Sequence, residues 1–509
     1  MWFEKQQGAQ DVILLGAGFS MAVGSKFPLT EKLGQLALHD AGVPQHERPA
    51  EGTGFEAWLS RVGQDQPYRS VEENLAARRL FVQMSTAIAH VMRNQQILAL
   101  QSAPPAWLDD LISVLHARQA TVVSFNYDNV VECAVDGHCL MDWTGGGIGR
   151  PVTSHDIVDR LPPLPPSILS EELPIEPTLY DQVHELSPSP RRDADQVARS
   201  LRLLKLHGSL SWYWSPDDET GVTLQRWRVP GTFGNPSLDD EEARLRALPG
   251  RVPFIVPPTA TKSSYLTNLV VREIWSRART ALAEAERLIV IGYSVPPEDQ
   301  VVSGMLAEAL RGRDIEVIIV DRCVAHVEDR LRDLGVDPAG VQRFDGQSCV
   351  EEFACWYRDE LARAVVASLR SWAAEVERGR TGDESSERDN PGLQGQVHVE
   401  WGWGDLVNSR EQYPALRNDG VLDLNGIEDS AGGEDLRVPL VALGTVRRID
   451  QNQVPTLLRR LSVSDQVRRL VVQTVSGQDF PVLDYMVSQP SIADPSRHLT
   501  LVPSGHPRH

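Results

Sequence analysis

The 509-residue chain lacks any hydrophobic run approaching the ~20 residues that a membrane-spanning helix needs. Its first residues, 1–6, also lack the basic start and apolar middle of a signal peptide. The first apolar run, 12–15, has only the length of a strand. With 41% apolar and 24% charged residues, the composition is that of an ordinary globular protein. We therefore expect a soluble, cytoplasmic protein without a membrane partner.

Cysteine is scarce and irregularly placed. The five cysteines are an odd number and include no Cys-x-x-Cys pair, which argues against both a disulfide framework and a zinc knuckle. We expect buried free thiols and no bound metal.

Basic residues are also in deficit, since 50 Lys and Arg stand against 70 Asp and Glu and give a formal net charge of -20. A field of this sign repels nucleic-acid phosphates unless a local basic patch overrides it. Direct binding to nucleic acid is therefore disfavoured.

What the sequence does contain is a repeated strand-then-helix pattern. Short runs rich in β-branched and apolar residues end abruptly in Gly, Asn or Asp, and helix-like periodicity follows. The strand-like runs are 11–15, 120–125, 287–291 and 316–320, with a crossover helix expected at 298–310. This pattern predicts an α/β fold with a Rossmann-like, doubly wound parallel sheet and a ligand site at the carboxyl ends of its strands.

The chain is longer than one hydrophobic core usually supports, so more than one domain is expected. A helical insert is predicted at 29–115, and a Pro-rich, irregular excursion at 145–190. A polar run at 376–393, too poor in apolar residues to pack, predicts a linker between a catalytic domain at 1–375 and a smaller C-terminal domain at 394–509. This smaller domain, of unknown function, is predicted to be β-rich or α+β from the runs at 396–401, 438–443 and 470–474.

The loop after the first strand has a Gly-x-Gly pattern. Without a Cβ, Gly16 and Gly18 let the backbone approach a pyrophosphate closely, and Ser20 lies at the start of the following helix. Met21 stands where the common dinucleotide fingerprint has a third glycine, so an ordinary dehydrogenase loop is not indicated. A purely structural tight turn is the alternative interpretation.

Two later strand ends also carry polar residues suited to chemistry. Asn126 and Asp128 follow the second strand, where an amide or a carboxylate is suited to orient a water or a carboxamide. A helix N-cap is the structural alternative for both. His207 and Gly208 end another apolar run, and His207 is either catalytic or a structural imidazole.

Four motifs, taken in order, resemble the sirtuin-like NAD-binding domain: 16–20, 126–128, 207–208 and 292–294, each at a strand end. The resemblance covers about residues 8–360. It is closest to the sirtuin-like domains of prokaryotic anti-phage systems, in which NAD is consumed.

The resemblance implies a role for each matched residue. The pyrophosphate and adjoining ribose would be held by Gly16, Ala17, Gly18 and Ser20. Asn126 would position the attacking water and Asp128 the carboxamide, while His207, followed by Gly208, would contact the nicotinamide ribose as general base or orienting group. The adenosine half would be contacted by Gly292 and Ser294, with Asp299 supporting their loop and Asp321 accepting hydrogen bonds from the adenine ribose.

Two departures separate this chain from protein-deacylating sirtuins. The five scattered cysteines cannot supply their Cys₄ zinc module. Their Gly-rich loop is also followed by Gly-Ile-Pro-Asp-Phe-Arg, whereas Gly24 here leads into 25–30, which contains neither an acid nor Arg. We therefore predict an NAD+ hydrolase that releases nicotinamide and ADP-ribose without a metal, rather than a deacylase.

The resemblance further implies a regulated effector that depletes NAD in anti-phage defence by abortive infection. Because an unregulated NAD hydrolase would kill its host, we expect autoinhibition by the Pro-rich excursion, the C-terminal domain or the packing of a homo-oligomer. We also expect an activating or inhibiting protein partner encoded nearby. The alternatives are a non-hydrolytic NAD or ADP-ribose sensor, and an ADP-ribosyltransferase or deacylase of the sirtuin type.

Overall fold

The structure is a computed structural model, and the parts of the chain that it describes fall in several segments. These are 11–138, 140–142, 150–158, 200–216, 218, 223–236, 244, 246–259, 263–266, 268–336, 340–361, 363, and four C-terminal strands between 435 and 502. The linker predicted at 376–393 and most of the Pro-rich stretch at 145–190 lie outside the described residues. The predicted domain limits therefore stay predictions.

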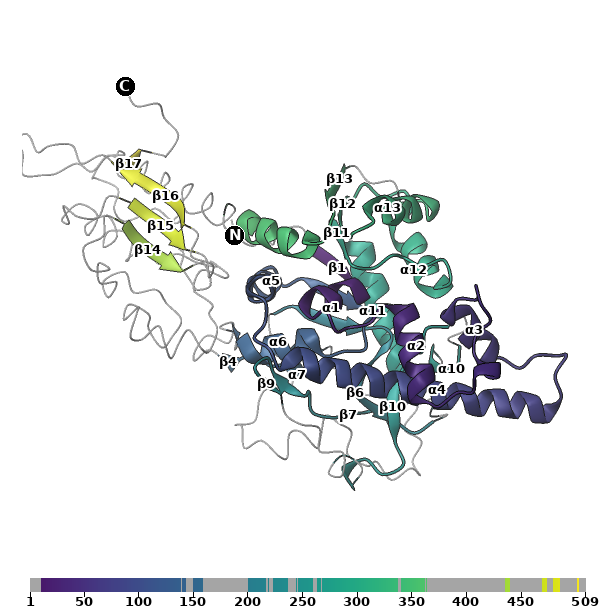
Figure 1. Ribbon diagram of the computed structural model, residues 1–509. Coiled ribbons are helices and arrows are strands. Elements are labelled where there is room, and N and C mark those ends of the chain that lie inside the picture. The colour runs from purple at the N-terminus through teal and green to yellow at the C-terminus, as the bar shows by residue number, and fades with distance from the viewer. Residues whose placement is uncertain are drawn as a thin grey trace, which may run out of the picture.

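A parallel sheet of six strands forms the centre of the N-terminal part, in the order β13-β12-β11-β1-β2-β5 (Figure 1). All its strand pairs are parallel, and helices flank the sheet. The α/β prediction is thus confirmed, and the strand order is compatible with a Rossmann-like fold. The strands are β1 (Asp11–Leu15), β2 (Thr121–Ser124), β5 (Arg202–Lys205), β11 (Arg287–Ile291), β12 (Glu316–Val320) and β13 (Gly340–Phe344).

The central strands are buried over their length because helices cover the sheet. Every residue of β1 and of β11 is buried, and their near-continuous apolar runs are typical of strands covered on both faces. In register, Leu15 of β1 lies beside Ser124 of β2 on one side and Ile291 of β11 on the other. The carboxyl ends of these three strands therefore meet at one edge.

That edge includes the point at which the order of the strands reverses. From β1 the chain proceeds outward through β2 to β5, and it then returns to the other side of β1 for β11, β12 and β13. Open α/β sheets bind ligands in the crevice outside the carboxyl ends of the strands at such a point. The loops after β1 and β11 are consequently the first place to look for a site.

The helical insert predicted between the first two strands is confirmed. Its longest helix begins at Ser70, which forms a capping box with Glu73. α1 (Ala17–Val23) precedes the predicted insert. The insert itself comprises α2 (Thr30–Asp40), a 3₁₀ helix (Gln45–Glu47), α3 (Phe55–Val62), α4 (Val71–Leu100) and α5 (Ala106–Arg118). The helices that follow are α6 (Val130–His138), α7 (Ser154–Ile157), α10 (Ser263–Leu266), α11 (Leu269–Glu284), α12 (Gln300–Leu310), α13 (Val324–Asp333) and a helix at 349–361.

The apolar run that carries His207 is split between two sheets. β5 ends at Lys205, a turn contains His207, and β6 (Gly208–Trp214) then pairs antiparallel with β10 (Val252–Ile255) and β7 (Gln225–Arg226). His207 therefore lies at the carboxyl end of β5, on the same edge as the ends of β1 and β2. Two short antiparallel pairs are formed by β3 (Met141–Asp142) with β4 (Arg150–Pro151) and by β8 (Gly231–Thr232) with β9 (Asn235–Pro236).

The described C-terminal strands form a separate four-stranded sheet. β14 (Asp435–Pro439) and β15 (Arg469–Gln473) are parallel, whereas β16 (Asp479–Tyr485) and β17 (Leu501–Val502) continue it antiparallel. Two of the runs that predicted β structure overlap β14 and β15. Among the described helices, none combines the length and apolar character required to cross a membrane.

Candidate functional site

Two glycine loops pack backbone against backbone where the strand order reverses. Gly16 N donates to Ile291 O at 3.0 Å, and Gly18 N donates to Gly292 O at 2.9 Å. A Cβ on Gly16 would lie 2.4 Å from Gly292 O, and one on Gly18 would lie 2.7 Å from Gly292 Cα. The glycines are thus required for this backbone contact itself, independently of any ligand.

Replacing Gly292 with alanine is expected to lower the free energy of unfolding by about 2–3 kcal/mol. Its φ is 58°, and the added Cβ would lie 2.4 Å from Phe19 N, where backbone has little room to move. Chemical denaturation measures the loss. Gly304→Ala in α12 is the control, because its Cβ would meet open space and alanine favours a helix by up to ~1 kcal/mol. Equal stability of the two variants would contradict the close packing of the loops.

The loop offers fewer free amides to a pyrophosphate than its sequence suggests. The N–H groups of Gly16 and Gly18 bond to the β11 loop, and Phe19 N bonds to Gly16 O. Ala17 is exposed, and the structure gives its N–H no partner among the described residues. Ser20, in contrast, is buried and engaged by other side chains.

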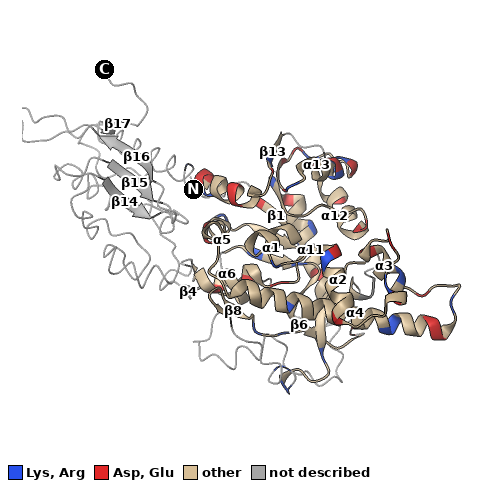
Figure 2. Cartoon of the chain, in the orientation of Figure 1, with Lys and Arg blue, Asp and Glu red and all other residues tan. Residues whose placement is uncertain are grey.

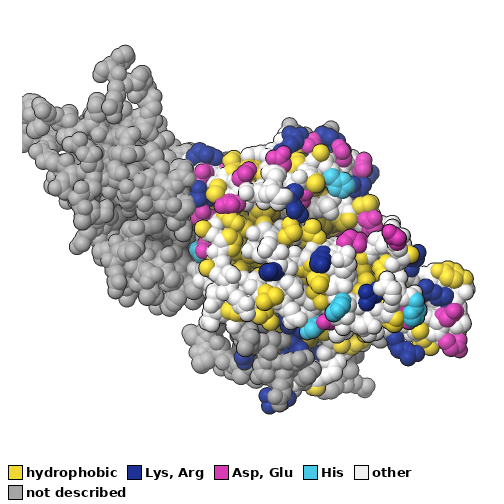
Figure 3. All heavy atoms as spheres, in the orientation of Figure 1, with side chains coloured by type: hydrophobic (Ala, Val, Ile, Leu, Met, Phe, Trp, Pro, Cys, Tyr) yellow, Lys and Arg dark blue, Asp and Glu magenta, His cyan; other side chains and the backbone are white. Residues whose placement is uncertain are grey.

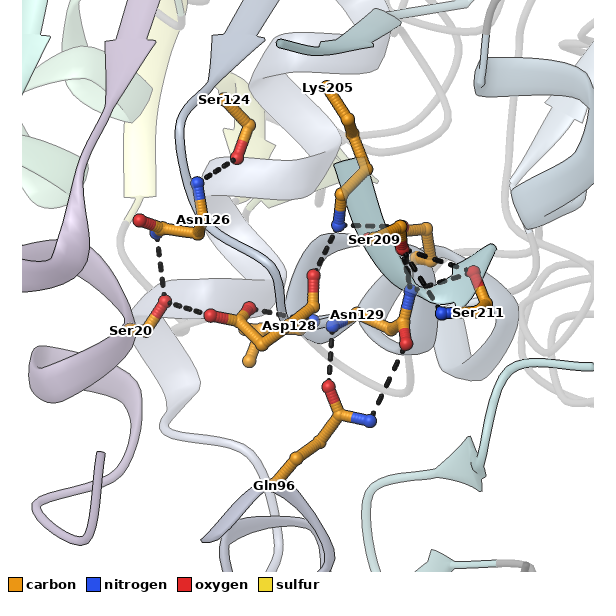
Figure 4. Close-up of polar contacts among 11 residues, drawn as sticks. Ser20, Gln96, Ser124, Asn126, Asp128, Asn129, Lys205, Ser209 and Ser211 are labelled. Carbon is orange, nitrogen blue, oxygen red and sulfur yellow. Dashed lines mark hydrogen bonds and ion pairs between the residues drawn. The ribbon is translucent and has the colours of Figure 1, made fainter. Parts of the chain in front are cut away.

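The side-chain amide of Asn126 is fixed in one orientation. Its Nδ2 donates to Gly16 O at 2.8 Å and to Ser20 Oγ at 2.9 Å (Figure 4). Because a backbone carbonyl only accepts, the nitrogen and not the oxygen must face Gly16. Both amide protons are therefore committed, and Oδ1, which points away from Ser20 in Figure 4, remains as an acceptor.

Asp128 holds this arrangement in place. Its Oδ2 accepts from Ser20 Oγ at 2.7 Å, and its Oδ1 accepts from Val130 N at 3.2 Å at the start of α6. Burial raises the pKa of the Asp128 carboxyl, while Lys205 and the Ser20 hydrogen bond oppose that shift. The bond to Val130 N at the start of α6 is the cap-type contact expected as the structural alternative for Asp128. The same carboxylate also forms a chain of contacts through Ser20 to Asn126.

Behind Asp128 lies a buried polar network that the sequence did not predict. Lys205 Nζ donates to the Asp128 carbonyl and forms an ion pair with Glu132 at 3.1 Å. Asn129 donates from its side chain to Ser209 at 2.9 Å and from its backbone to Gln96 of α4 (Figure 4). The only feature of the sequence that pointed to this network is Lys205, a lysine within an apolar strand. The network joins β5, β6, α4 and α6 beneath the 126–128 segment.

His207 is paired with an acid from a distant part of the chain. Its Nε2 lies 3.4 Å from Asp299 Oδ2, and both residues are buried. Asp299 also accepts from Val302 N at the start of α12, so the carboxylate is anchored. A neighbouring carboxylate orients an imidazole and stabilises its protonated form. Gly208 permits the turn, since its φ is 79° and a Cβ would lie 2.1 Å from Phe254 O.

Aromatic rings connect His207 with the glycine loops. The Phe125 ring lies 5.3 Å from the His207 ring and stacks on Tyr293 at 4.1 Å. Burial raises the pKa of the Tyr293 phenol, as do the nearby carboxylates of Asp299 and Glu56. The predicted strand ends place Phe125 and Tyr293 at this edge, although sequence reasoning gave neither a role. The α3 residue Glu56 was missed, because only the fold brings it here.

The outer part of the edge holds the residues predicted for the adenosine half. Gly292 N bonds to Val320 O at 2.9 Å, which places the end of β12 and Asp321 beside the Gly292 loop. Asp321 Oδ1 accepts from Cys323 N at 2.8 Å, and Ser294 is exposed. The same loop contains Val295, a β-branched residue at the unusual φ of 50°. Such strained positions cluster at functional sites.

The predicted residues therefore fall into three groups along one edge of the sheet. The groups are Gly16, Ala17 and Gly18 with Gly292, Ser294 and Asp321; Ser20 with Asn126 and Asp128; and His207 with Gly208 and Asp299. Among the described residues, no three His, Cys, Asp or Glu side chains are grouped as metal ligands would be. Four of the cysteines are free thiols. Cys133 and Cys349 are buried as expected, whereas Cys323 is exposed and Cys355 is half-buried.

Comparison of the chain with known protein families and with curated protein sequences found no match. The functional interpretation consequently depends on the motifs in the sequence and on the geometry of this edge.

Proposed function

We propose that this edge binds NAD+ and hydrolyses the bond between nicotinamide and ribose. The observation that supports this most is Asn126, whose amide protons are both bound by Gly16 O and Ser20 Oγ. Its remaining acceptor is held rigidly beside the loop expected to bind the dinucleotide. A fixed acceptor of this kind is suited to orienting a water molecule for attack on a sugar carbon.

The other residues supply what the reaction needs. Loss of nicotinamide leaves positive charge on the ribose, so the site must stabilise an oxocarbenium-like transition state and direct one water to it. In the proposal, the His207 imidazole, held by Asp299, orients a ribose hydroxyl or takes the proton that the water releases. The oxygen of the water joins C1′, the bond to nicotinamide breaks, and ADP-ribose results. No metal is required for these steps.

The adenosine half would lie along the Gly292 loop. Asp321, at the end of β12, would accept from the hydroxyls of the adenine ribose, as an acid at this position does in other dinucleotide sites. Ala17 and Gly18 line the approach to the pyrophosphate. Ser20 would act through Asn126 and not through the phosphates, because its hydroxyl is already bound on both sides.

The biological role proposed is that of a regulated effector that removes NAD during anti-phage defence. This part of the proposal depends on the resemblance of the four motifs to sirtuin-like domains. A partner protein that activates or restrains the enzyme belongs to the same proposal.

Calorimetry with NAD+ and chromatography of the products test the proposal on the purified full chain, with and without a candidate partner. We expect binding, followed by release of nicotinamide. Binding without release would favour the sensor alternative. Transfer of labelled ADP-ribose to a macromolecule would favour the transferase alternative. Absence of binding under all conditions would overturn the proposal.

A further inference from the structure

The first half of α4 projects from the body of the protein. α4 spans Val71–Leu100, but its first fully buried side chain is Met84. In Figure 1 this part of the helix extends beyond the neighbouring elements, next to the loop that precedes it. Three turns of helix therefore have no core to pack against on their outer face.

An apolar stripe follows that outer face. Val71, Leu75 and Val82 are 71%, 48% and 60% exposed, and Arg78 lies between the last two. The spacing of four, three and four residues is that of the seam along which two helices pair in a coiled coil. Single exposed apolar residues are ordinary, but a stripe at this spacing indicates a surface that is covered in use. Figure 3 shows hydrophobic side chains beside charged ones at this tip.

Charges of opposite sign flank the stripe. Glu72 and Arg79 lie on one side of it, and the structure gives neither a partner among the described residues. Arg78, by contrast, is bound by Asp65 of the preceding loop. Basic and acidic residues are both visible along the projecting half of α4 in Figure 2. Because Glu72 and Arg79 are seven residues apart on the same side, the acid of one helix can lie beside the base of a second, antiparallel copy of the helix, and the base beside the acid.

We propose that two copies of this chain pair through the α4 seam, defined as Val71, Leu75, Arg78 and Val82, with the helices antiparallel. In this register Val71 faces Val82 of the second copy, and Leu75 faces the aliphatic stem of Arg78 of the second copy. Glu72 then lies beside Arg79 of the second copy, and the twofold axis repeats the pair. A parallel pairing would instead place Arg78 against Arg78, so like charges would face each other.

The size of the seam defines what kind of dimer to expect. Three turns of paired helix bury less accessible surface than the ~1,600 Å² that a standard stable interface buries. The dimer is therefore reversible and its population depends on protein concentration. The seam lies on α4, apart from the edge that carries Asn126, so pairing is independent of the proposed hydrolysis.

Sedimentation velocity over a range of concentrations of the full chain tests the pairing. The wild type is expected to dimerise, and Leu75→Glu to weaken the dimer roughly a hundredfold, because both copies lose an apolar contact and gain a buried charge. Glu72→Arg and Arg79→Glu should each weaken it roughly tenfold, since two symmetry-related attractions become repulsions. The double variant should recover the wild-type dissociation constant.

Leu98→Glu is the matched control, because Leu98 is an exposed leucine of the same helix that lies away from the seam. It should leave the dimer intact, and far-UV circular dichroism should show that every variant remains folded. A wild type that stays monomeric at all concentrations would overturn the proposal, and so would a dimer that Leu75→Glu leaves unchanged. Failure of the double variant to recover would overturn the antiparallel register.

Discussion

Replacing Asn126 with alanine is expected to lower the rate of nicotinamide release by about 10²–10³-fold, the loss typical of removing one group that orients or stabilises the reacting atoms. The substitution removes Oδ1, the acceptor left after both amide protons are bound. It also removes two hydrogen bonds, so a loss of stability of about 1–3 kcal/mol accompanies it. Product chromatography gives the rate, and thermal denaturation shows that the variant is folded.

The Ser20→Ala variant separates the proposed chemical role of Asn126 from the hydrogen bonds that hold its side chain in place. This variant loses the hydroxyl that links Asn126 to Asp128, but it keeps the Oδ1 acceptor of Asn126 and the bond that Asn126 Nδ2 donates to Gly16 O. We expect it to retain more than about a tenth of the wild-type rate, because Asn126 stays anchored on one side. Asn94→Ala, on the exposed face of α4, is the matched control and should have no effect. Full turnover by the Asn126 variant would exclude Asn126 from the reaction.

Loss of the His207 imidazole should have the second-largest effect. His207→Ala is expected to lower the turnover of NAD+ by about 10²-fold or more, as removal of a general base or orienting group does. Asp299→Asn should lower it less, because the imidazole remains but loses the carboxylate 3.4 Å from its Nε2. Steady-state kinetics of nicotinamide release give kcat and KM for each variant.

The double variant shows whether Asp299 acts through His207. If it does, adding Asp299→Asn to His207→Ala costs no further activity, because residues that act as a unit are not additive. The chain contains a matched surface pair, His90 and Asp40, whose Nδ1 and Oδ1 lie 2.8 Å apart. His90→Ala should leave turnover unchanged. Equal losses from the two histidine variants would point to a general effect on stability and not to chemistry.

The strands that form the centre of the sheet were predictable, because a strand that is buried on both faces has a continuous run of apolar residues in the sequence. β1, β11 and β12 lie at the predicted residues, and each is a short apolar run that stops at a polar or glycine residue. A parallel sheet then brings the ends of those strands to one edge without further information. The sequence could therefore indicate that the residues after β1, β2 and β11 are neighbours.

What each side chain contacts was not predictable. No local pattern indicated that the Ser20 hydroxyl contacts Asn126 and Asp128, because the depth of the loop depends on its packing against Gly292. Asp299 was expected to support the Gly292 loop, and it accepts from Val302 N at the start of α12, but no motif indicated that it also lies beside His207. Such pairings depend on how α12 and the turn after β5 meet, which no local pattern records.

The buried network beneath the site illustrates the same limit. Lys205 and Glu132 lie on different elements, and neither is marked by a motif. Burying the two charges is tolerated because they pair and because Lys205 also bonds to the Asp128 carbonyl. A lysine in an apolar strand indicates that a partner exists, but only the fold identifies it.

The ratio of products tests the central proposal most directly. Full-length protein is incubated with NAD+, with and without a candidate partner, and nicotinamide and free ADP-ribose are quantified together. We predict equal amounts of the two products from the wild type, and about 10²–10³-fold less of both from Asn126→Ala. NAD+ that binds but stays intact, or nicotinamide released without free ADP-ribose, would contradict hydrolysis at this edge of the sheet.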